Sequence, residues 1–370
     1  MVKKNPSRGL CFAGGNRGNA TGREGGLKSM LTTRRLLALC VLVVVSSGAS
    51  TEKKPFIDWA QLKNPVLSYS NWSVKDAAMA YRKGTFFVFF SAFYPDNGRI
   101  RCHVAEVSTP DFKHYSQPLL DFDGEDDGWM GMCSPDVQLL SGEYVMTFNS
   151  WGDKAGKPNQ LFYKTSEDLV HWSQRKPLAL NLTRSGDQRV IDAALAQADG
   201  GYYLVYKEQT PGIHSRPRMA FSTSLDGPFH YVGDGIVSLL LKDGKDDGFF
   251  HENFEMIHTN ARWYMLTTDY LHNRLNPIKY DVQAPYIYTL EPGSNWLEWT
   301  QGHTLNIPRE KFNMESIDNA AALYDWRKYD GFYYLIYAGR NDGLAYARRG
   351  WNRIGLARSR DMVHWSVPGR

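Results

Sequence analysis

The rest of the chain repeats the pattern found in Asp192-Ala-Ala-Leu-Ala-Gln-Ala-Asp-Gly-Gly-Tyr-Tyr-Leu-Val-Tyr206. An acidic residue opens a short apolar strand, a turn with glycine follows, and an aromatic strand runs back. The same unit stands earlier in the chain as Asp76-Ala-Ala-Met-Ala-Tyr-Arg-Lys-Gly-Thr-Phe-Phe-Val-Phe-Phe90. In both copies the first aromatic residue of the return strand comes ten residues after the acid. Looser copies begin at Ser134, Glu252 and Asp318, so the chain consists of five similar β units.

Each return strand is followed by a polar loop and another strand, and several units close with a Trp-containing strand, as at Trp172, Trp299 and Trp365. Four short strands per unit and a period of roughly sixty residues predict an all-β fold, a five-bladed β-propeller with four antiparallel strands per blade. A β-sandwich is the alternative, but it does not explain why an acid recurs at the start of most units. In a propeller, the loops before the first strand and after the second strand share one face, so their side chains should gather around one mouth.

The first 50 residues do not follow this pattern. Residues 30–50 resemble a secretory signal, with a basic pair at 34–35, an apolar run over 36–45 and small residues before Ser50. The apolar run is too short to span a membrane stably, although an N-terminal anchor is the alternative. We therefore expect an N-terminal extension and signal over residues 1–50, a propeller domain over residues 51–370, and a secreted or periplasmic protein without stable membrane insertion after signal cleavage.

The formal charge of +4 misleads about the predicted domain. The first 50 residues contain eight Lys or Arg residues and one Glu, so the remaining residues carry a net charge of −3. This charge excludes a basic nucleic-acid-binding protein. Of the four cysteines, Cys102 and Cys133 lie in the domain, where a disulfide and a pair of buried thiols are both compatible with the sequence.

Three carboxylates, Asp76, Asp192 and Glu252, are expected to open the first strand of units one, three and four. Acids that converge on a narrow channel repel one another, which drives their pKa values apart. Glycoside hydrolysis needs such a set, because one acid must donate a proton to the leaving oxygen while another acts on water or on the sugar. The alternative is that these acids only accept hydrogen bonds from backbone N–H groups, which is the role we expect for Asp136.

Four segments carry a resemblance to glycoside hydrolase family 43 and to its five-bladed relatives in families 32, 62, 68 and 117. They are Lys75-Asp-Ala-Ala-Met-Ala, Ser134-Pro-Asp-Val-Gln, Val190-Ile-Asp-Ala-Ala-Leu and His251-Glu-Asn-Phe-Glu. The resemblance covers roughly residues 60–370 and implies a general base at Asp76, a general acid at Glu252, and an Asp192 that orients the acid and sets its pKa. Asn253 and Phe254 follow Glu252 where that family often has Gly and Pro, so Glu255 competes for the role of acid. The resemblance implies no required cofactor and is compatible with a structural Ca²⁺ in the central channel.

The predicted function is that of an exported glycoside hydrolase acting on plant or algal polysaccharides or oligosaccharides, with arabinosides and xylosides as the leading substrates. Inversion would place the two carboxyl groups about 6.5–9.5 Å apart, whereas retention, with Asp76 as the nucleophile, would place them about 5–5.5 Å apart. A non-catalytic carbohydrate-binding propeller and a protein-interaction propeller are the alternatives, and the oligomeric state stays open. The residues expected to bind carbohydrate at the mouth are Trp129, Ser134, Trp151, Arg189, Tyr270 and Arg340.

Overall fold

The computed structural model describes residues 55–123, 128–152, 159–183, 189–209, 215–247, 251–270, 283–314, 316–317, 322–340 and 352–369. The chain divides into two units, Met1–Glu52 and Lys53–Arg370, and all the described helices and strands belong to the second. The expected extension and signal over residues 1–50 lie outside the described residues. Short helices occur at η1 (Trp59–Gln61), η4 (Lys311–Asn313) and α1 (Arg327–Asp330). In the ranges just given, no helix has the length and apolar character needed to cross a membrane.

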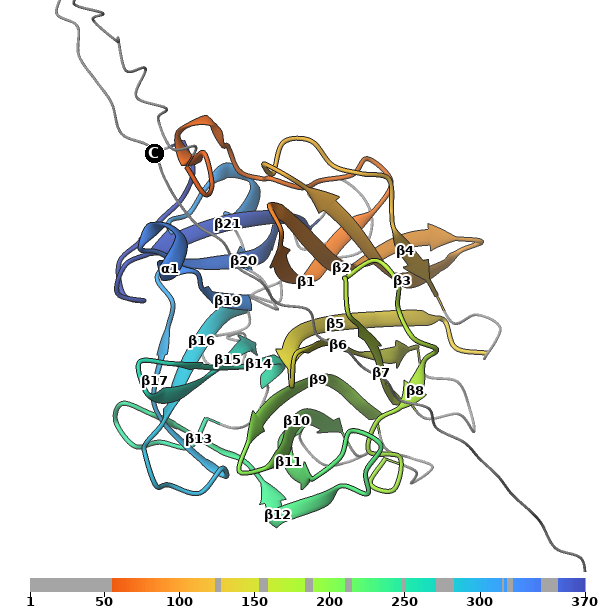
Figure 1. The fold of residues 1–370 in the computed structure, drawn as a ribbon, viewed down its shortest axis with the longest axis vertical. Coiled ribbons are helices and arrows are strands. Elements are labelled where there is room, and N and C mark those ends of the chain that lie inside the picture. The colour runs from red at the N-terminus through yellow and green to blue at the C-terminus, as the bar shows by residue number, and fades with distance from the viewer. Residues whose placement is uncertain are drawn as a thin grey trace, which may run out of the picture. The chain divides into compact units, whose positions relative to one another are not determined.

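The strands form the predicted five-bladed β-propeller (Figure 1). Blade one contains β1 (Ser73–Arg82), β2 (Thr85–Asp96), β3 (Arg99–Thr109) and β4 (Leu120–Phe122). Blade two contains β5 (Gly131–Leu140), β6 (Glu143–Trp151), β7 (Leu161–Ser166) and β8 (Lys176–Pro177). Blade three contains β9 (Arg189–Ala198), β10 (Gly201–Gln209), β11 (Arg216–Ser222) and β12 (His230–Ile236). Within these blades, consecutive strands pair antiparallel, as the alternating pattern of apolar strands and tight turns predicted.

The last two blades vary the same plan. Blade four contains β14 (His251–Thr259), β15 (Arg262–Tyr270), β16 (Gln283–Leu290) and β17 (Glu298–Thr304), and β13 (Ser238–Leu241) pairs parallel with β17. Blade five contains β18 (Ser316–Ile317), β19 (Ala322–Asp325), β20 (Tyr333–Arg340), β21 (Arg353–Ser359) and β22 (Trp365–Ser366). Both β18 and β19 pair with β20, so two short segments stand where the other blades have one long innermost strand.

The innermost strands close a ring around the centre of the unit (Figure 1). Strand β1 contacts β5, β5 contacts β9, β9 contacts β14, β14 contacts β19, and β19 contacts β1. These strands are buried on both faces and carry small residues such as Ala77, Ala78, Ala193 and Ala194. Small side chains allow five strands to approach one axis closely, and the acidic residues of the repeat are therefore brought to the centre of the fold.

Residues before the first blade complete the ring by pairing with the last blade. Leu67 forms an antiparallel bridge with Ile354 in β21. The side chain of Asn64 donates to the carbonyl of Leu356 (2.9 Å) and accepts the Leu356 N–H (2.9 Å), as a strand partner would. These hydrogen bonds attach the segment before blade one to blade five and cover the part of β21 that β22 does not pair with.

Cys102 and Cys133 are both free thiols, and both are buried where β3 meets β5. Of the two alternatives that the sequence left open, the structure therefore has the pair of buried thiols. Burial, followed by the hydrogen bond with Cys133, raises the pKa of Cys102 well above its usual value. Both cysteines are thus expected to be unreactive in the folded chain.

Candidate functional site

The innermost strands of blades one to four carry a β-bulge at the same place. Pairing with the second strand is interrupted between residues 75 and 78, 133 and 136, 191 and 194, and 252 and 255. The residue inside each bulge has a left-handed backbone, namely Asp76 (φ 53°), Ser134 (φ 56°), Asp192 (φ 59°) and Asn253 (φ 52°). This conformation is uncommon outside glycine and is tolerated best by Asp and Asn. We call these four positions the bulge residues, since they are equivalent in three dimensions.

A bulge leaves a backbone N–H outside the ladder, and the preceding blade supplies an acceptor for it. The N–H of Ser134 donates to Oγ of Ser91 (2.8 Å), and the N–H of Asp192 donates to Oδ1 of Asn149 (2.9 Å). The N–H of Asn253 donates to Oδ2 of Asp192 (3.2 Å). Asp192 therefore holds the next blade in place, as the structural alternative for these acids proposed, and this role does not occupy all of its carboxylate.

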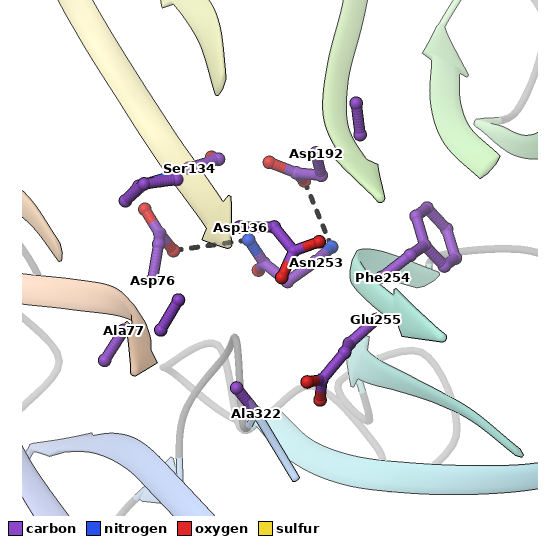
Figure 2. A pocket seen from close by; sticks show the side chains of 12 residues that line it. Asp76, Ala77, Ser134, Asp136, Asp192, Asn253, Phe254, Glu255 and Ala322 are labelled. Atoms are coloured by element: carbon purple, nitrogen blue, oxygen red, sulfur yellow. Dashed lines mark hydrogen bonds between the residues drawn. The ribbon is translucent and has the colours of Figure 1, made fainter. Parts of the chain in front are cut away.

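The bulge residues line a pocket at the centre of the propeller, which we call the central pocket (Figure 2). Its remaining lining residues are neighbours on the innermost strands, namely Ala77, Ala78, Pro135, Asp136, Ala193, Phe254, Glu255 and Ala322. In Figure 2 the side chain of Asn253 lies between Asp76 and Asp192. Its Nδ2 donates to Oδ1 of Asp76 (3.2 Å), while its backbone N–H donates to Asp192. A single residue thus links two buried carboxylates that are 116 positions apart in the sequence.

The acid of the fourth blade stands in a different position from the other two. Glu252 comes one residue before the bulge residue Asn253, in the place that Lys75 and Ile191 hold in blades one and three. Counting ten residues back from Trp263, the first aromatic residue of the return strand, gives Asn253, so the repeat located Glu252 only to within one residue. Glu252 is buried, with 7% of its surface exposed, but it is not among the residues that line the central pocket.

The sequence led us to expect that the three acids open their strands, but they do not. The strands β1, β9 and β14 begin at Ser73, Arg189 and His251, ahead of all three acids. The expectation was wrong because the strands continue through the bulges instead of starting after them. The consequence is that Asp76 and Asp192 are 1% and 4% exposed, deeper than residues of a loop would be.

The charge of Asp192 is opposed by its surroundings. Burial contributes most, and the negative charges of Glu252 and Asp76 add to it, so the pKa of Asp192 rises from 3.8 to about 6. The ammonium of Lys207 and a hydrogen bond from Ser134 act in the opposite direction. Asp192 thus changes its charge near neutral pH, which is a property typical of functional carboxyl groups.

Two buried lysines accompany the acids, and sequence reasoning missed both. Nζ of Lys207 lies 2.8 Å from Oε2 of Glu252, and Nζ of Lys75 lies 3.4 Å from Oδ1 of Asp76. The only signal available was position, since Lys75 precedes Asp76 directly and Lys207 ends the aromatic run of the third return strand. A buried ion pair requires close contact and further hydrogen bonds to offset desolvation, and these two ammonium groups offset part of the negative charge of the acids.

Asp136 and Glu255, which also line the central pocket, form a second pair of carboxyl groups. Burial raises the pKa of Asp136 to about 7, and burial together with the charge of Asp136 raises that of Glu255 well above its usual value. Oε2 of Glu255 accepts the N–H of Leu323 (2.6 Å), and Oδ1 of Asp136 accepts the side-chain amide of Gln138 (3.4 Å). The role expected for Asp136 was to accept backbone N–H groups, and its hydrogen bond from the Val137 N–H agrees with that role. The bond with Leu323 links Glu255 to β19.

Among the residues expected to bind carbohydrate, Ser134 lines the central pocket. Trp129 and Trp151 are half-buried and pack edge-on against Phe162 and Phe93, with ring centroids 5.6 and 5.3 Å apart. Both rings therefore pack against other blade residues, which was the alternative to carbohydrate binding.

Three more predicted residues lie at the ends of strands. Arg189 begins β9 and is half-buried, and Arg340 ends β20 and is buried. Neither lines the central pocket. The backbone of Tyr270 ends β15, but its side chain lies outside the described residues. A role in carbohydrate binding stays a prediction for all three.

Comparison with solved structures identifies the same architecture in carbohydrate-active proteins. An exo-1,5-α-L-arabinanase from a bovine ruminal metagenomic library is 14% identical and has a TM-score of 0.52, with 79% of this chain and 95% of that chain covered. An α-L-arabinofuranosidase from Lactobacillus brevis is 12% identical and has a TM-score of 0.57, with 83% and 97% covered.

A third similar structure comes from the GH130 family, described as containing glycoside hydrolases that target β-1,2 mannosidic linkages in Candida mannan. It is 15% identical, has a TM-score of 0.56, and covers 81% of this chain and 87% of its own. No protein-family model matches the chain, and no curated protein sequence does. At these identities the comparisons establish the fold, the five-bladed propeller resembling that of family 43 glycosidases.

Proposed function

We propose that the chain is an exported glycoside hydrolase. The observation that carries the proposal is the set of buried carboxylates at the centre of the propeller. Asp76 and Asp192 are linked through Asn253, and Glu252 is close enough to contribute to the raised pKa of Asp192. Burying several carboxylates together destabilises a fold, so such a set is typical of a functional site.

In the proposed reaction, Asp76 accepts a proton from a water molecule as that water attacks the anomeric carbon. Glu252 donates a proton to the glycosidic oxygen as it leaves, and Asp192 orients the sugar and the acid. Nζ of Lys207 donates to the carboxylate of Glu252. Glu252 must therefore release this contact and take up a proton before it can act as the acid. Lys207 thus influences when Glu252 is protonated. Inversion is the proposed outcome, and retention would instead make Asp76 the nucleophile.

Arabinosides are the first substrates to test, followed by xylosides. An arabinanase and an arabinofuranosidase with the same fold support this order, and the mannoside-acting neighbour adds β-1,2-mannosides to the panel. Hydrolysis of aryl glycosides and of plant and algal polysaccharides should be measured for the wild type, Asp76→Asn and Glu252→Gln. The exposed Glu298→Gln provides a matched control of the same chemistry.

The proposal expects turnover of at least one substrate by the wild type and the control, and a loss of at least 100-fold in both site variants with the fold intact. Full activity in Glu252→Gln together with loss in Glu255→Gln would move the acid to Glu255. A folded wild type that hydrolyses none of the panel would contradict the proposal.

A non-catalytic carbohydrate-binding propeller is the second candidate. It is favoured by Asn253, which places an amide rather than an acid at the fourth bulge, and by the ion pair that engages Glu252. Calorimetric titration with the sugars of the same panel separates the two candidates. Binding without turnover supports the second, and turnover supports the first.

We also propose export to the outside of the cell or to the periplasm, supported by the signal pattern of residues 30–50. N-terminal sequencing of the exported protein should give a start near Ser50. No cofactor is needed for the proposed steps. A structural Ca²⁺ in the channel would find oxygen ligands of the type it prefers in Ser134, Asp136 and Glu255. A rise in the unfolding temperature on addition of Ca²⁺ would support it.

A further inference from the structure

A second cluster of side chains lies beside the proposed acid and is not used by the proposed reaction. Asp247, His251 and Asp269 each offer one ligand-type atom, and these atoms lie within 4.8 Å of one another. His251 opens β14 directly before Glu252, and Asp269 is its partner across the ladder in β15. The N–H of Asp247 donates to the carbonyl of Leu239 (2.7 Å), which anchors the third member to β13.

The imidazole of His251 is oriented by a residue outside the cluster. Its Nδ1 lies 2.6 Å from Oγ1 of Thr267, a shorter distance than either contact of Nε2. Its Nε2 lies 3.4 Å from Oδ2 of Asp247 and 3.3 Å from the hydroxyl of Tyr288. A metal-bound histidine commonly uses its other ring nitrogen to bond a fixed partner, as Nδ1 does here. With the proton on Nδ1, the lone pair of Nε2 is directed to the cluster.

The distance between one pair of ligand atoms, Nε2 of His251 and Oδ2 of Asp247, suits an ion between them better than a direct bond. A hydrogen bond from an imidazole nitrogen to a carboxylate is normally about 2.7–2.9 Å long. Two ligands bound at about 2.1 Å to a tetrahedral ion are separated by roughly 3.4 Å. The separation of 3.4 Å between Nε2 of His251 and Oδ2 of Asp247 agrees with the second value.

Charge and burial favour a cation as well. His251 is 0% exposed and Asp269 is 1% exposed. The donor set combines a neutral imidazole with two carboxylates, so a divalent ion would balance its charge. Lys207, the ammonium nearby, donates to Glu252 at 2.8 Å.

We propose that Asp247, His251 and Asp269 form a binding site for one divalent transition-metal ion, best matched by Zn²⁺. The nitrogen ligand favours Zn²⁺ over Ca²⁺ and Mg²⁺, which prefer oxygen donors throughout. The bound ion ties β13, β14 and β15 together one residue away from Glu252. It acts on the position of that residue and not on the sugar. The site does not depend on the proposed hydrolase activity.

The test measures binding of Zn²⁺ to the full chain, freed of any purification tag and treated with chelator. Isothermal titration with Zn²⁺ and metal analysis after dialysis should give one ion per chain. His251→Gln and Asp269→Asn should each weaken binding by about 100-fold or more. Thr267→Val, which removes only the partner of Nδ1, should weaken binding by about 10–100-fold. Asp243→Asn, which changes an exposed acid four residues before Asp247, should bind Zn²⁺ as the wild type does.

A titration with Co²⁺ gives a second readout that does not require the variants to be stable. Visible d–d absorption of a four-coordinate site with nitrogen and oxygen ligands is expected in the wild type. A wild type that binds no Zn²⁺ and shows no such absorption would overturn the site, as would unchanged binding in His251→Gln and Asp269→Asn. Because no sugar is present, these results are separate from success or failure of the glycosidase proposal.

Discussion

Replacing Asp192 by Asn should stabilise the protein at alkaline pH while it removes the proposed activity. The carboxyl group is buried, and burial together with the charges of Glu252 and Asp76 raises its pKa from 3.8 to about 6. The amide has nearly the same shape and no charge, and its oxygen can still accept the N–H of Asn253. The substitution therefore removes the cost of the buried charge and keeps the hydrogen bond between blades.

The magnitude follows from the pKa shift and its sign. The folded state binds the proton of Asp192 more tightly than the unfolded state does. Its contribution to stability is therefore fully present below pH 3.8 and is lost as the pH rises through about 6. A shift of about two pH units corresponds to roughly 3 kcal/mol. The variant should match the wild type to within about 1 kcal/mol at pH 4 and exceed it by about 3 kcal/mol at pH 8, or roughly 5 °C in Tm.

Urea unfolding of the wild type and Asp192→Asn, followed by tryptophan fluorescence at pH 4 and pH 8, measures this difference. Asp234→Asn is the control, because that acid is exposed and accepts the N–H of Ile236 within its own turn. A variant that is no more stable than the wild type at pH 8 would contradict this expectation. It would show that the contacts of the carboxylate outweigh the cost of its burial.

Three further experiments test the contacts around the site. Gly131→Ala should lower the unfolding free energy by about 2 kcal/mol or more in urea titrations, because a Cβ there would lie 1.9 Å from the Cys102 carbonyl oxygen. Lys207→Met should lower the free energy of unfolding by about 3–5 kcal/mol at pH 8, because it removes the cation that contacts the buried Glu252. The loss should be smaller at pH 5. In the chain that begins at Ser50, neither Cys102 nor Cys133 should react with a thiol reagent until urea unfolds the protein.

Each of these results has a contradictory outcome. An unchanged midpoint in Gly131→Ala would show that β3 and β5 can separate without loss. A Lys207→Met variant whose stability loss does not depend on pH would show that the lysine acts through packing. Rapid reaction of the native thiols would show that the contact between blades one and two opens in solution.

The sequence predicted the fold because each blade repeats a signal that is local. The aromatic return strand and the glycine turn before it lie within one hairpin, so the spacing of ten residues between Asp76 and Phe86 and between Asp192 and Tyr202 is maintained by one register. The same spacing predicted that Asp76 and Asp192 meet at the centre, because equivalent positions of a propeller face one channel.

The positions that the sequence did not predict depend on contacts between blades. The repeat spacing of ten residues leads from Trp263 back to Asn253, but it does not show that Asn253 bonds acids of two other blades. Lys207 pairs with an acid 45 residues away, and nothing in its own strand indicates that partner. The group around His251 combines three segments, and its residues have no metal-binding spacing along the chain.

The offset in the fourth blade has a physical reason that bears on function. An acid at position 253 would lie between Asp76 and Asp192, and three adjacent carboxylates would repel one another strongly. Asn253 instead donates to both, so the pair is held together by hydrogen bonds. Glu252, one residue earlier, lies beside Lys207, whose positive charge offsets its burial. The fold thereby gives Glu252 a different environment from Asp76 and Asp192. Such a difference in environment is what allows one acid to donate a proton while another accepts one.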